Sequence, residues 1–391
     1  MPRWPRFWAA RSSSSAGRRW LSLFRVGGKW DQYGWVTRVP LSILDLAPVS
    51  SGSSVGDALR NSIALVKRAE ELGYNRYWVA EHHSMPGIAS SSPAVLLAHL
   101  AMATSTIRLG SGGVMLPNHA PLAIAEQFGM LEAIHGPRID LGLGRAPGTD
   151  RVTARALRGT RLAESDDFPQ RFAELRAFFN GTFPSDHPYA RITAVPGLGN
   201  EPAYWLLGSS DFGAQMAGQL GLPFSFAHHF GTGGTELALE AYRSTFSPSV
   251  VLEEPYSMIG VSVVCAQTES HARFLAAASA LGFLWLRLGR PSQMPTPEEA
   301  RDYPYTVQER AFIEQRLRSA VIGTPSQVCE QLDELVRVHN VNELMITTAV
   351  HSHEDRMRSF ELVAEAWGLT PRTNVERQDV SEPPTILHSA V

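Results

Sequence analysis

From Val39 to Leu369 the chain alternates eight times between a short apolar segment and a longer segment with helical periodicity. In the first helical segment, Leu59, Ile63 and Val66 recur with a spacing close to 3.6 residues. The short segments are apolar almost throughout, which is typical of parallel strands that are buried on both faces. Eight strand–helix units with right-handed crossovers predict a (β/α)8 barrel, and a doubly wound sheet is the alternative. The predicted strands are Pro40–Ala47, Arg76–Ala80, Ile107–Met115, Arg138–Leu143, Ala203–Leu207, Pro223–Ala227, Ser257–Cys265 and Glu343–Thr348.

Two insertions interrupt the strand–helix rhythm. Residues 145–200 follow the fourth strand and contain extra helix near Phe172–Phe179. Residues 288–318 follow the seventh strand and its helix, and their proline and charge content predicts a mobile excursion across the barrel mouth. The regular helices are predicted at Val55–Leu72, Pro93–Ala103, Pro121–Ile134, Ser210–Leu220, Thr235–Thr245, Ser270–Leu286, Ser326–His339 and Ser352–Trp367.

The two ends of the chain differ from the rest in composition. Residues 1–38 are rich in arginine and serine and contain no acidic residue before Asp31. This composition is typical of a transit peptide, and an over-extended gene model that starts before the true first residue would also explain it. We therefore expect the folded domain to be 39–370, preceded by an extension that does not belong to the fold. The polar segment 371–391 is predicted to be a disordered tail.

The bulk composition narrows the functional class. With 44% hydrophobic and 19% charged residues and a net charge of −3, the chain offers no electrostatic case for nucleic-acid binding. Its two cysteines, Cys265 and Cys329, have neither disulfide-framework nor zinc-ribbon spacing, which suits a reducing compartment. No apolar run approaches the roughly 20 residues that a membrane span needs. These features predict a cytoplasmic enzyme or binding protein with no membrane partner.

Histidines follow two of the predicted strands, at the end of the barrel where chemistry is expected. The second strand ends in Glu81-His82-His83 and the sixth in His228-His229. Adjacent residues on a strand point to opposite faces, so at most one histidine of each pair can face a shared site. Three interpretations stay open: metal ligands, histidines of the core or of helix caps, and an acid–base histidine at the mouth.

Two neighbouring loops have the chemistry of a phosphate site. Ser209 and Ser210 lead directly into a helix, whose free N–H groups and dipole attract anions. Arg145 follows a Gly-x-Gly after the fourth strand, and a guanidinium suits bidentate phosphate binding. A simple capped helix would explain the serines alone, but the two loops together favour a phosphate ligand. The stretch "GLGRAPG" lacks the spacing and context of a dinucleotide-binding fingerprint.

Gly112 and Gly113 lie inside the third predicted strand. Glycine weakens a strand unless a ligand or another backbone must approach closely. A planar ring lying against this backbone would explain the pair, and so would a bulge where a barrel strand bends.

Together, the motifs "YWVAEHH", "GSGGVMLPNHAP", "GLGRAPG" and "GSSDFGAQ" resemble those of the bacterial luciferase-like, flavin-dependent monooxygenase family, in the family's order. The resemblance extends over most of the chain and implies a (β/α)8 barrel that binds reduced FMN and uses molecular oxygen. Because no nicotinamide fingerprint is present, a separate flavin reductase is the expected source of reduced FMN. The family's barrels commonly pair, so a homodimer is expected.

By position, the resemblance gives His82 the catalytic role in the oxygen chemistry of the flavin. It makes Gly112 and Gly113 the pair that forms a cis peptide bond beneath the flavin ring. It assigns the flavin phosphate to the two loops described above, through Arg145, Ser209 and Ser210, and it implies no metal ligand.

The chain also departs from the light-emitting members of the family. They carry a cysteine where this chain has Gly144 and a glutamate where it has Ser209, so luminescence is not implied. The expected substrate is a small organic molecule, with an aldehyde as one candidate. An F420-dependent dehydrogenase on the same barrel and a non-catalytic flavin-binding protein are the alternative functions.

Overall fold

The computed structural model describes residues 38–159, 167–231 and 233–371. The predictions for the two ends of the chain therefore lie outside the described residues, apart from Arg38 and Pro371.

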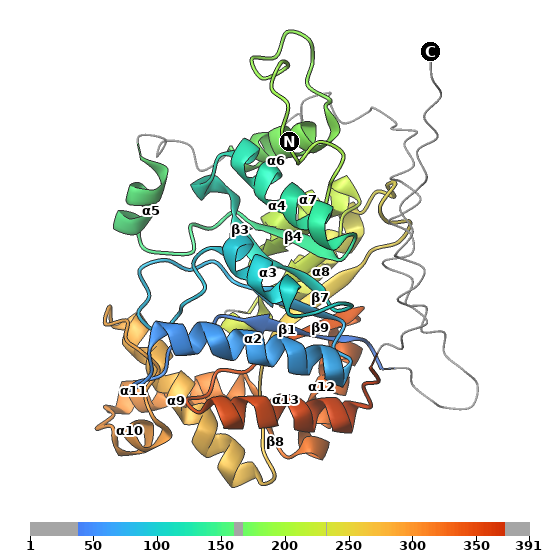
Figure 1. Cartoon of the computed structure of the whole chain (residues 1–391). Helices are drawn as coiled ribbons and strands as arrows, with labels where there is room; N and C mark the ends of the chain where they lie inside the picture. The colour runs from blue at the N-terminus through green and yellow to red at the C-terminus, as the bar shows by residue number, and fades with distance from the viewer. Residues whose placement is uncertain (1–37, 160–166, 232, 372–391) are drawn as a thin grey trace, which may run out of the picture.

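Eight parallel strands form a closed barrel, as the alternation of apolar and helical segments predicts. Neighbours in the sequence pair from β1 to β6, β6 pairs with β7, and β9 closes the ring between β7 and β1. Figure 1 shows the helices arranged around these strands. The barrel strands are β1 Leu41–Asp45, β2 Arg76–Val79, β3 Arg108–Met115, β4 Ile139–Gly144, β5 Ala203–Gly208, β6 Phe224–Phe226, β7 Ser257–Cys265 and β9 Glu343–Thr347.

A ninth strand, which the sequence did not lead us to expect, lies outside the barrel. The three residues of β8, Val321–Gly323, pair with the last residues of the long strand β7, from Val263 to Cys265. The barrel part of β7 is already engaged by β9 up to Ser262. Because β8 has only three residues, its sequence is too short to show the periodicity that predicts a strand.

Some helices begin at a capping side chain and end at a left-handed glycine. The first, α2, starts with a capping box between Ser54 and Asp57 and ends at Gly73, whose φ of 87° is left-handed. No helix in the described part of the chain combines the length and the apolar character needed to cross a bilayer. The helices are α2 Val55–Leu72, α3 Pro93–Met102, α4 Pro121–His135, α5 Arg151–Arg158, α6 Phe168–Asn180, α7 Asp211–Leu220, α8 Thr235–Thr245, α9 Glu269–Arg287, α10 Pro297–Asp302, α11 Val307–Arg318, α12 Pro325–His339 and α13 His353–Trp367, with 3-10 turns η2 Leu116–Asn118 and η3 His228–Phe230.

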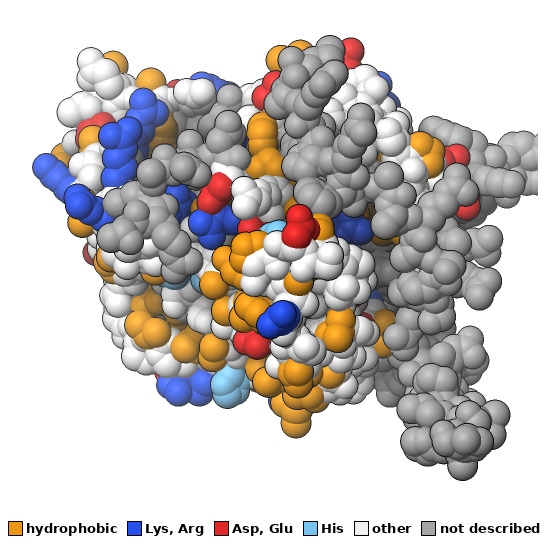
Figure 2. All heavy atoms as spheres, turned by 90° about the horizontal axis from the view of Figure 1, so that it is seen from above, with side chains coloured by type: hydrophobic (Ala, Val, Ile, Leu, Met, Phe, Trp, Pro, Cys, Tyr) orange, Lys and Arg blue, Asp and Glu red, His pale blue; other side chains and the backbone are white. Residues whose placement is uncertain are grey.

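Both predicted insertions are present and are partly helical. Residues 145–200 contain α5 and α6, and the basic side chains of α5 belong to the group of Lys and Arg at the left edge of Figure 2. Residues 288–318 form α10 and α11, and each of these begins with a capping box. Both helices pack on α9. The second insertion is therefore largely helical rather than irregular, and its Met294 pairs with Ser50 in the loop after β1, at the barrel mouth.

Four paired charges fill the inside of the barrel near the N-terminal ends of its strands. Arg76, only 1% exposed, lies 2.7 Å from Asp140 and 2.8 Å from Glu343, and Arg108 also pairs with Asp140. The guanidinium of Arg76 lies 4.8 Å from the ring centroid of Trp205. Burial alone would lower the pKa of Arg76, but the carboxylates of Glu343 and Asp140 raise it above its usual value. Two positive and two negative groups balance, so the layer is neutral.

Replacing Arg76 by methionine should destabilise the fold strongly, because Glu343 would keep a buried charge without its partner. We expect a loss of about 3–5 kcal/mol in the free energy of unfolding, measured by urea denaturation. The control is Arg60→Met, which removes a helix-surface pair whose side chains are 70% and 50% exposed. That change should cost less than about 1 kcal/mol. Similar losses in the two variants would contradict a structural role for the buried layer.

Candidate functional site

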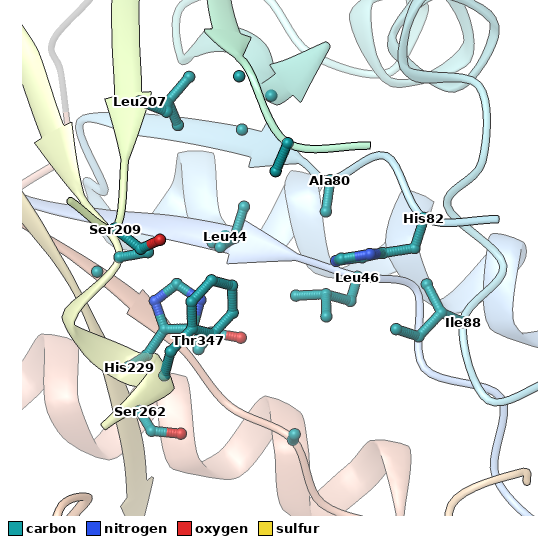
Figure 3. Close-up of a pocket in the computed structure, with 18 of the residues that line it drawn as sticks. Leu44, Leu46, Ala80, His82, Ile88, Leu207, Ser209, His229, Ser262 and Thr347 are labelled. Carbon is teal, nitrogen blue, oxygen red and sulfur yellow. The ribbon is translucent and has the colours of Figure 1, made fainter. Parts of the chain in front are cut away.

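A cavity of about 420 Å³ opens where the barrel strands end. Its walls are mainly apolar, and Figure 3 shows Leu44, Leu46, Ile88 and Leu207 around it. Among the described residues that line it there are three arginines and no aspartate or glutamate. A largely apolar pocket with a few polar groups is the usual form of a small-molecule site.

Glu81 explains why a buried strand ends in three adjacent ionisable groups. Its side chain is fully buried and accepts hydrogen bonds from His83 Nε2 at 3.0 Å, His119 Nε2 at 2.9 Å and the Met115 backbone N–H at 3.0 Å. Burial alone would raise the pKa of Glu81, but the hydrogen bonds from His119 and His83 outweigh it and lower the pKa. The ionised carboxylate thus ties the loop after β2 to the loop after β3. Sequence reasoning noted Glu81 but gave it no role.

His82 reaches into the cavity between these fixed loops (Figure 3). Its Nδ1 lies 3.1 Å from the carbonyl oxygen of Gly148. A carbonyl only accepts, so Nδ1 carries the proton and Nε2 of the neutral ring is left with its lone pair. Burial lowers the pKa of His82, and the Gly148 carbonyl opposes this only in part. His82 is therefore a neutral, oriented imidazole.

Gly148 is suited to hold His82 because it has no side chain. Its φ of +65° is left-handed, and a Cβ there would lie 2.8 Å from the backbone oxygen of Glu81. The loop after β4 therefore brings its carbonyl to the imidazole only with glycine at this position.

The peptide bond between Gly112 and Gly113 is cis, as the resemblance implied. The register between β3 and β4 also shifts here, so the bulge that was the other interpretation of the pair is present as well. A Cβ on Gly112 would lie 2.7 Å from Leu44, and one on Gly113 would lie 2.8 Å from the backbone oxygen of Gly142. Both glycines line the cavity and present bare backbone to it.

Arg145, Ser209 and Ser210 line the same cavity, as predicted from two separate loops. The guanidinium carbon of Arg145 lies 4.1 Å from the ring centroid of Phe212, the second residue of α7. Ser210 occupies the N-cap position of α7, but its hydroxyl makes no capping hydrogen bond. The capped-helix interpretation is therefore wrong for this side chain. The start of α7 keeps N–H groups available beside an arginine.

In each histidine pair, one residue lines the cavity and the other does not. His229 lines the cavity from the side opposite His82 (Figure 3), whereas Nδ1 of His228 lies 2.8 Å from Thr235 Oγ1. Burial lowers the pKa of His229 to about 4, so this ring is neutral. The prediction that only one histidine of each pair faces the site is confirmed. Within the described ranges, no three His, Cys, Asp or Glu side chains are grouped so as to hold a metal ion.

Sequence reasoning missed two charged residues that line the cavity. Arg356 of α13 is paired with Asp45 at 2.7 Å, whereas Arg316 belongs to α11. Its Nη1 donates to the carbonyl oxygen of His229 at 2.8 Å, and its guanidinium carbon lies 4.2 Å from the ring centroid of Phe283. The local sequence, "ERAFIEQRLR", contains three arginines that look alike. Only the packing of α11 on α9 singles out the one that reaches the cavity.

Comparisons with known proteins agree with this geometry. The family model described as luciferase-like monooxygenase matches residues 39–339. The uncharacterized protein YvbT of Bacillus subtilis (strain 168) is 48% identical over 327 residues, covering 84% of this chain and 96% of that protein. A luciferase-like monooxygenase of Escherichia coli (strain K12) is 43% identical with the same coverage.

Solved structures show the same fold. The crystal structure of apo-MsnO8 has 37% sequence identity and a TM-score of 0.78, and the match covers 86% of this chain and 100% of that one. More distant barrels include a Baeyer-Villiger monooxygenase in complex with FMN and an F420-dependent secondary alcohol dehydrogenase, with TM-scores of 0.61 and 0.60. At 17% and 13% identity these two show the fold alone. From the matched model and the close relatives, the chain belongs to the luciferase-like monooxygenase family.

Proposed function

We propose that this monooxygenase binds FMN in the cavity and, when the FMN is reduced, uses molecular oxygen to oxidise a small organic substrate. The observation that carries the proposal is the arrangement at the start of α7. There, Arg145 makes no hydrogen bond or ion pair with the described residues, and Ser210 leaves the helix start uncapped. These free donors are what a phosphate monoester requires.

The residues present fit FMN in shape as well as in charge. Arg145, Ser209, Ser210 and the first N–H groups of α7 would hold the phosphate. The bare backbone of the Gly112–Gly113 segment leaves room for a planar ring beside it. The arginines of α5, which follow Arg145 in the chain, add positive potential that attracts an anionic cofactor. When bound and reduced, FMN supplies the electrons for oxygen activation, which no side chain can supply.

His82 is the residue proposed to move a proton. The Gly148 carbonyl fixes its tautomer, so Nε2 is the atom that accepts a proton from the cavity side and later returns it. Glu81 holds the surrounding loops, and its hydrogen bonds go to His83 and His119 rather than to His82. The apolar walls limit the access of water to the reacting groups.

Two further proposals concern partners. A separate flavin reductase supplies reduced FMN, since the sequence contains no dinucleotide fingerprint of its own. Two copies of the chain pair through α3 and α4, where Val95, Met102, Met130 and Ile134 are all more than half exposed. Sedimentation equilibrium measures the mass of the particle and so tests the homodimer.

Arg145→Gln should weaken FMN binding at least tenfold, because it removes the charged donor to the phosphate. Flavin fluorescence titration measures the affinity, with F420 titrated in parallel to test the alternative cofactor. The matched control is Arg310→Gln, which removes another exposed arginine that lies over an aromatic ring, 5.8 Å from the centroid of Tyr305 and outside the cavity. Equal FMN affinities in the two variants, or tighter binding of F420 than of FMN by the wild type, would count against the proposal.

His82→Ala should keep FMN affinity and lower turnover by about 10²–10⁴-fold. Turnover is measured as oxygen uptake driven by reduced FMN, screened with long-chain aldehydes and related ketones. The control His228→Ala removes a histidine that points away from the cavity. Wild-type oxygen uptake in the His82→Ala variant would show that the assigned role is wrong, and an absence of substrate-stimulated uptake in the wild type would favour a non-catalytic flavin-binding protein.

The pH profile gives an independent test of His82. Its pKa in the folded protein is lowered from 6.5, so the proton-accepting form is present above that lowered pKa and is lost as the pH falls through it. The midpoint of the acidic decline in wild-type turnover should therefore lie below pH 6.5, whereas His82→Ala should lack this decline. A midpoint in the wild type well above pH 6.5 would assign the titration to another group.

A further inference from the structure

The cavity contains one more positive charge than FMN binding uses. Of its three lining arginines, Arg356 is neutralised by Asp45, whose carboxylate lies 2.7 Å from it. Arg145 is assigned to the cofactor phosphate. Arg316 remains, and no carboxylate of the described residues forms an ion pair with it. Arg316 is half-buried at the cavity wall, and an unpaired guanidinium in this position can bind an anion that enters from outside the chain.

The guanidinium of Arg316 is held by its flat face. Phe283 of α9 stacks on Phe312 of α11 with an interplanar angle of 11° and a centroid distance of 6.2 Å. Arg316 covers Phe283 at one end of this pair, and Arg287 covers Phe312 at the other, 4.9 Å from its centroid. Stacking engages only the face of the guanidinium, so the N–H groups at its edge can still donate hydrogen bonds. One of them donates to the carbonyl oxygen of His229.

The surroundings of Arg316 suit the anionic end of an otherwise apolar molecule. Phe283, whose ring the guanidinium covers, is apolar, and the cavity walls are mainly apolar elsewhere as well. His229, whose backbone carbonyl Arg316 holds, is neutral and so brings no competing charge. His82 and His229 lie on opposite sides of the cavity (Figure 3). A molecule anchored by its anionic end near His229 would therefore extend its apolar part toward His82.

We propose that Arg316 binds the carboxylate of the organic substrate, and that the substrate is accordingly a small aliphatic carboxylic acid rather than a neutral molecule. The inference rests on the proposed function, because FMN must occupy Arg145 for Arg316 to be the remaining anion site. It assigns a specificity role to the second insertion, which supplies α11.

The test compares octanoate with octanamide, which have the same chain but differ in charge. Isothermal titration calorimetry on FMN-saturated wild type at fixed ionic strength should show at least tenfold tighter binding of octanoate, as expected for a charge-assisted hydrogen bond. Arg316→Gln should reduce this preference to within about twofold while leaving FMN affinity unchanged. Arg287→Gln, which alters the other end of the same aromatic stack outside the cavity, should keep the preference.

Three results would overturn the proposal: an octanoate preference that survives in Arg316→Gln, an equal loss in Arg287→Gln, or a loss of FMN affinity in Arg316→Gln. The last would place Arg316 in the cofactor site.

Modification of wild-type arginines by phenylglyoxal, mapped by mass spectrometry, gives a measurement that needs no variant to fold. Octanoate should protect Arg316 but not Arg287, octanamide should protect neither, and unprotected Arg316 would contradict the proposal. If FMN fails to bind but octanoate still protects Arg316, the cofactor proposal fails and the anion site stands.

Discussion

The position of the whole site depends on the buried ion pairs of Arg76 with Asp140 and Glu343 inside the barrel. Side chains two apart on a strand face the same way, so Arg76 lies one layer below Trp78, which lines the cavity. The paired charges and the indole rings around them close the lower part of the barrel. The cavity can therefore open only at the C-terminal ends of the strands, and the loops there are attached to a rigid barrel.

Some polar groups of the site are fully hydrogen-bonded within the chain, and others are left without a partner charge among the described residues. Glu81 is satisfied by the chain itself, and its hydrogen bonds keep two loops in place. Arg145 and Arg316 are held by aromatic rings instead of by carboxylates, which fixes their positions without neutralising them. His82 is intermediate, with one ring nitrogen engaged by the chain and the other directed to the cavity. The groups left incomplete by the chain are the ones that a ligand can complete.

Much of the fold was readable from the sequence because parallel barrel strands are apolar on both faces and end at the mouth. The same rule predicts that Arg145 and Ser210 share one cavity. Only His82 of its pair lines the cavity, as expected, but both histidines lie beyond Val79, where β2 ends, so strand alternation is not the cause. What the sequence could not provide depends on contacts between distant segments. The role of Glu81 requires knowing that His119 lies beside it, and the uncapped Ser210 is a side-chain orientation rather than a pattern. Arg316 looks like any helix-surface arginine until α11 is packed on α9.

The aromatic stack between α9 and α11 has a consequence for how such a barrel diversifies. The groups assigned to the cofactor come from the ends of β2 to β5, whereas Arg316 arrives on a helical insertion that contacts the barrel mainly through α9. Sequence drift in the insertion can thus exchange a cationic side chain for a neutral or acidic one while the part of the cavity proposed to hold FMN stays as it is. Enzymes that share one flavin chemistry but accept chemically unlike molecules would be the natural outcome.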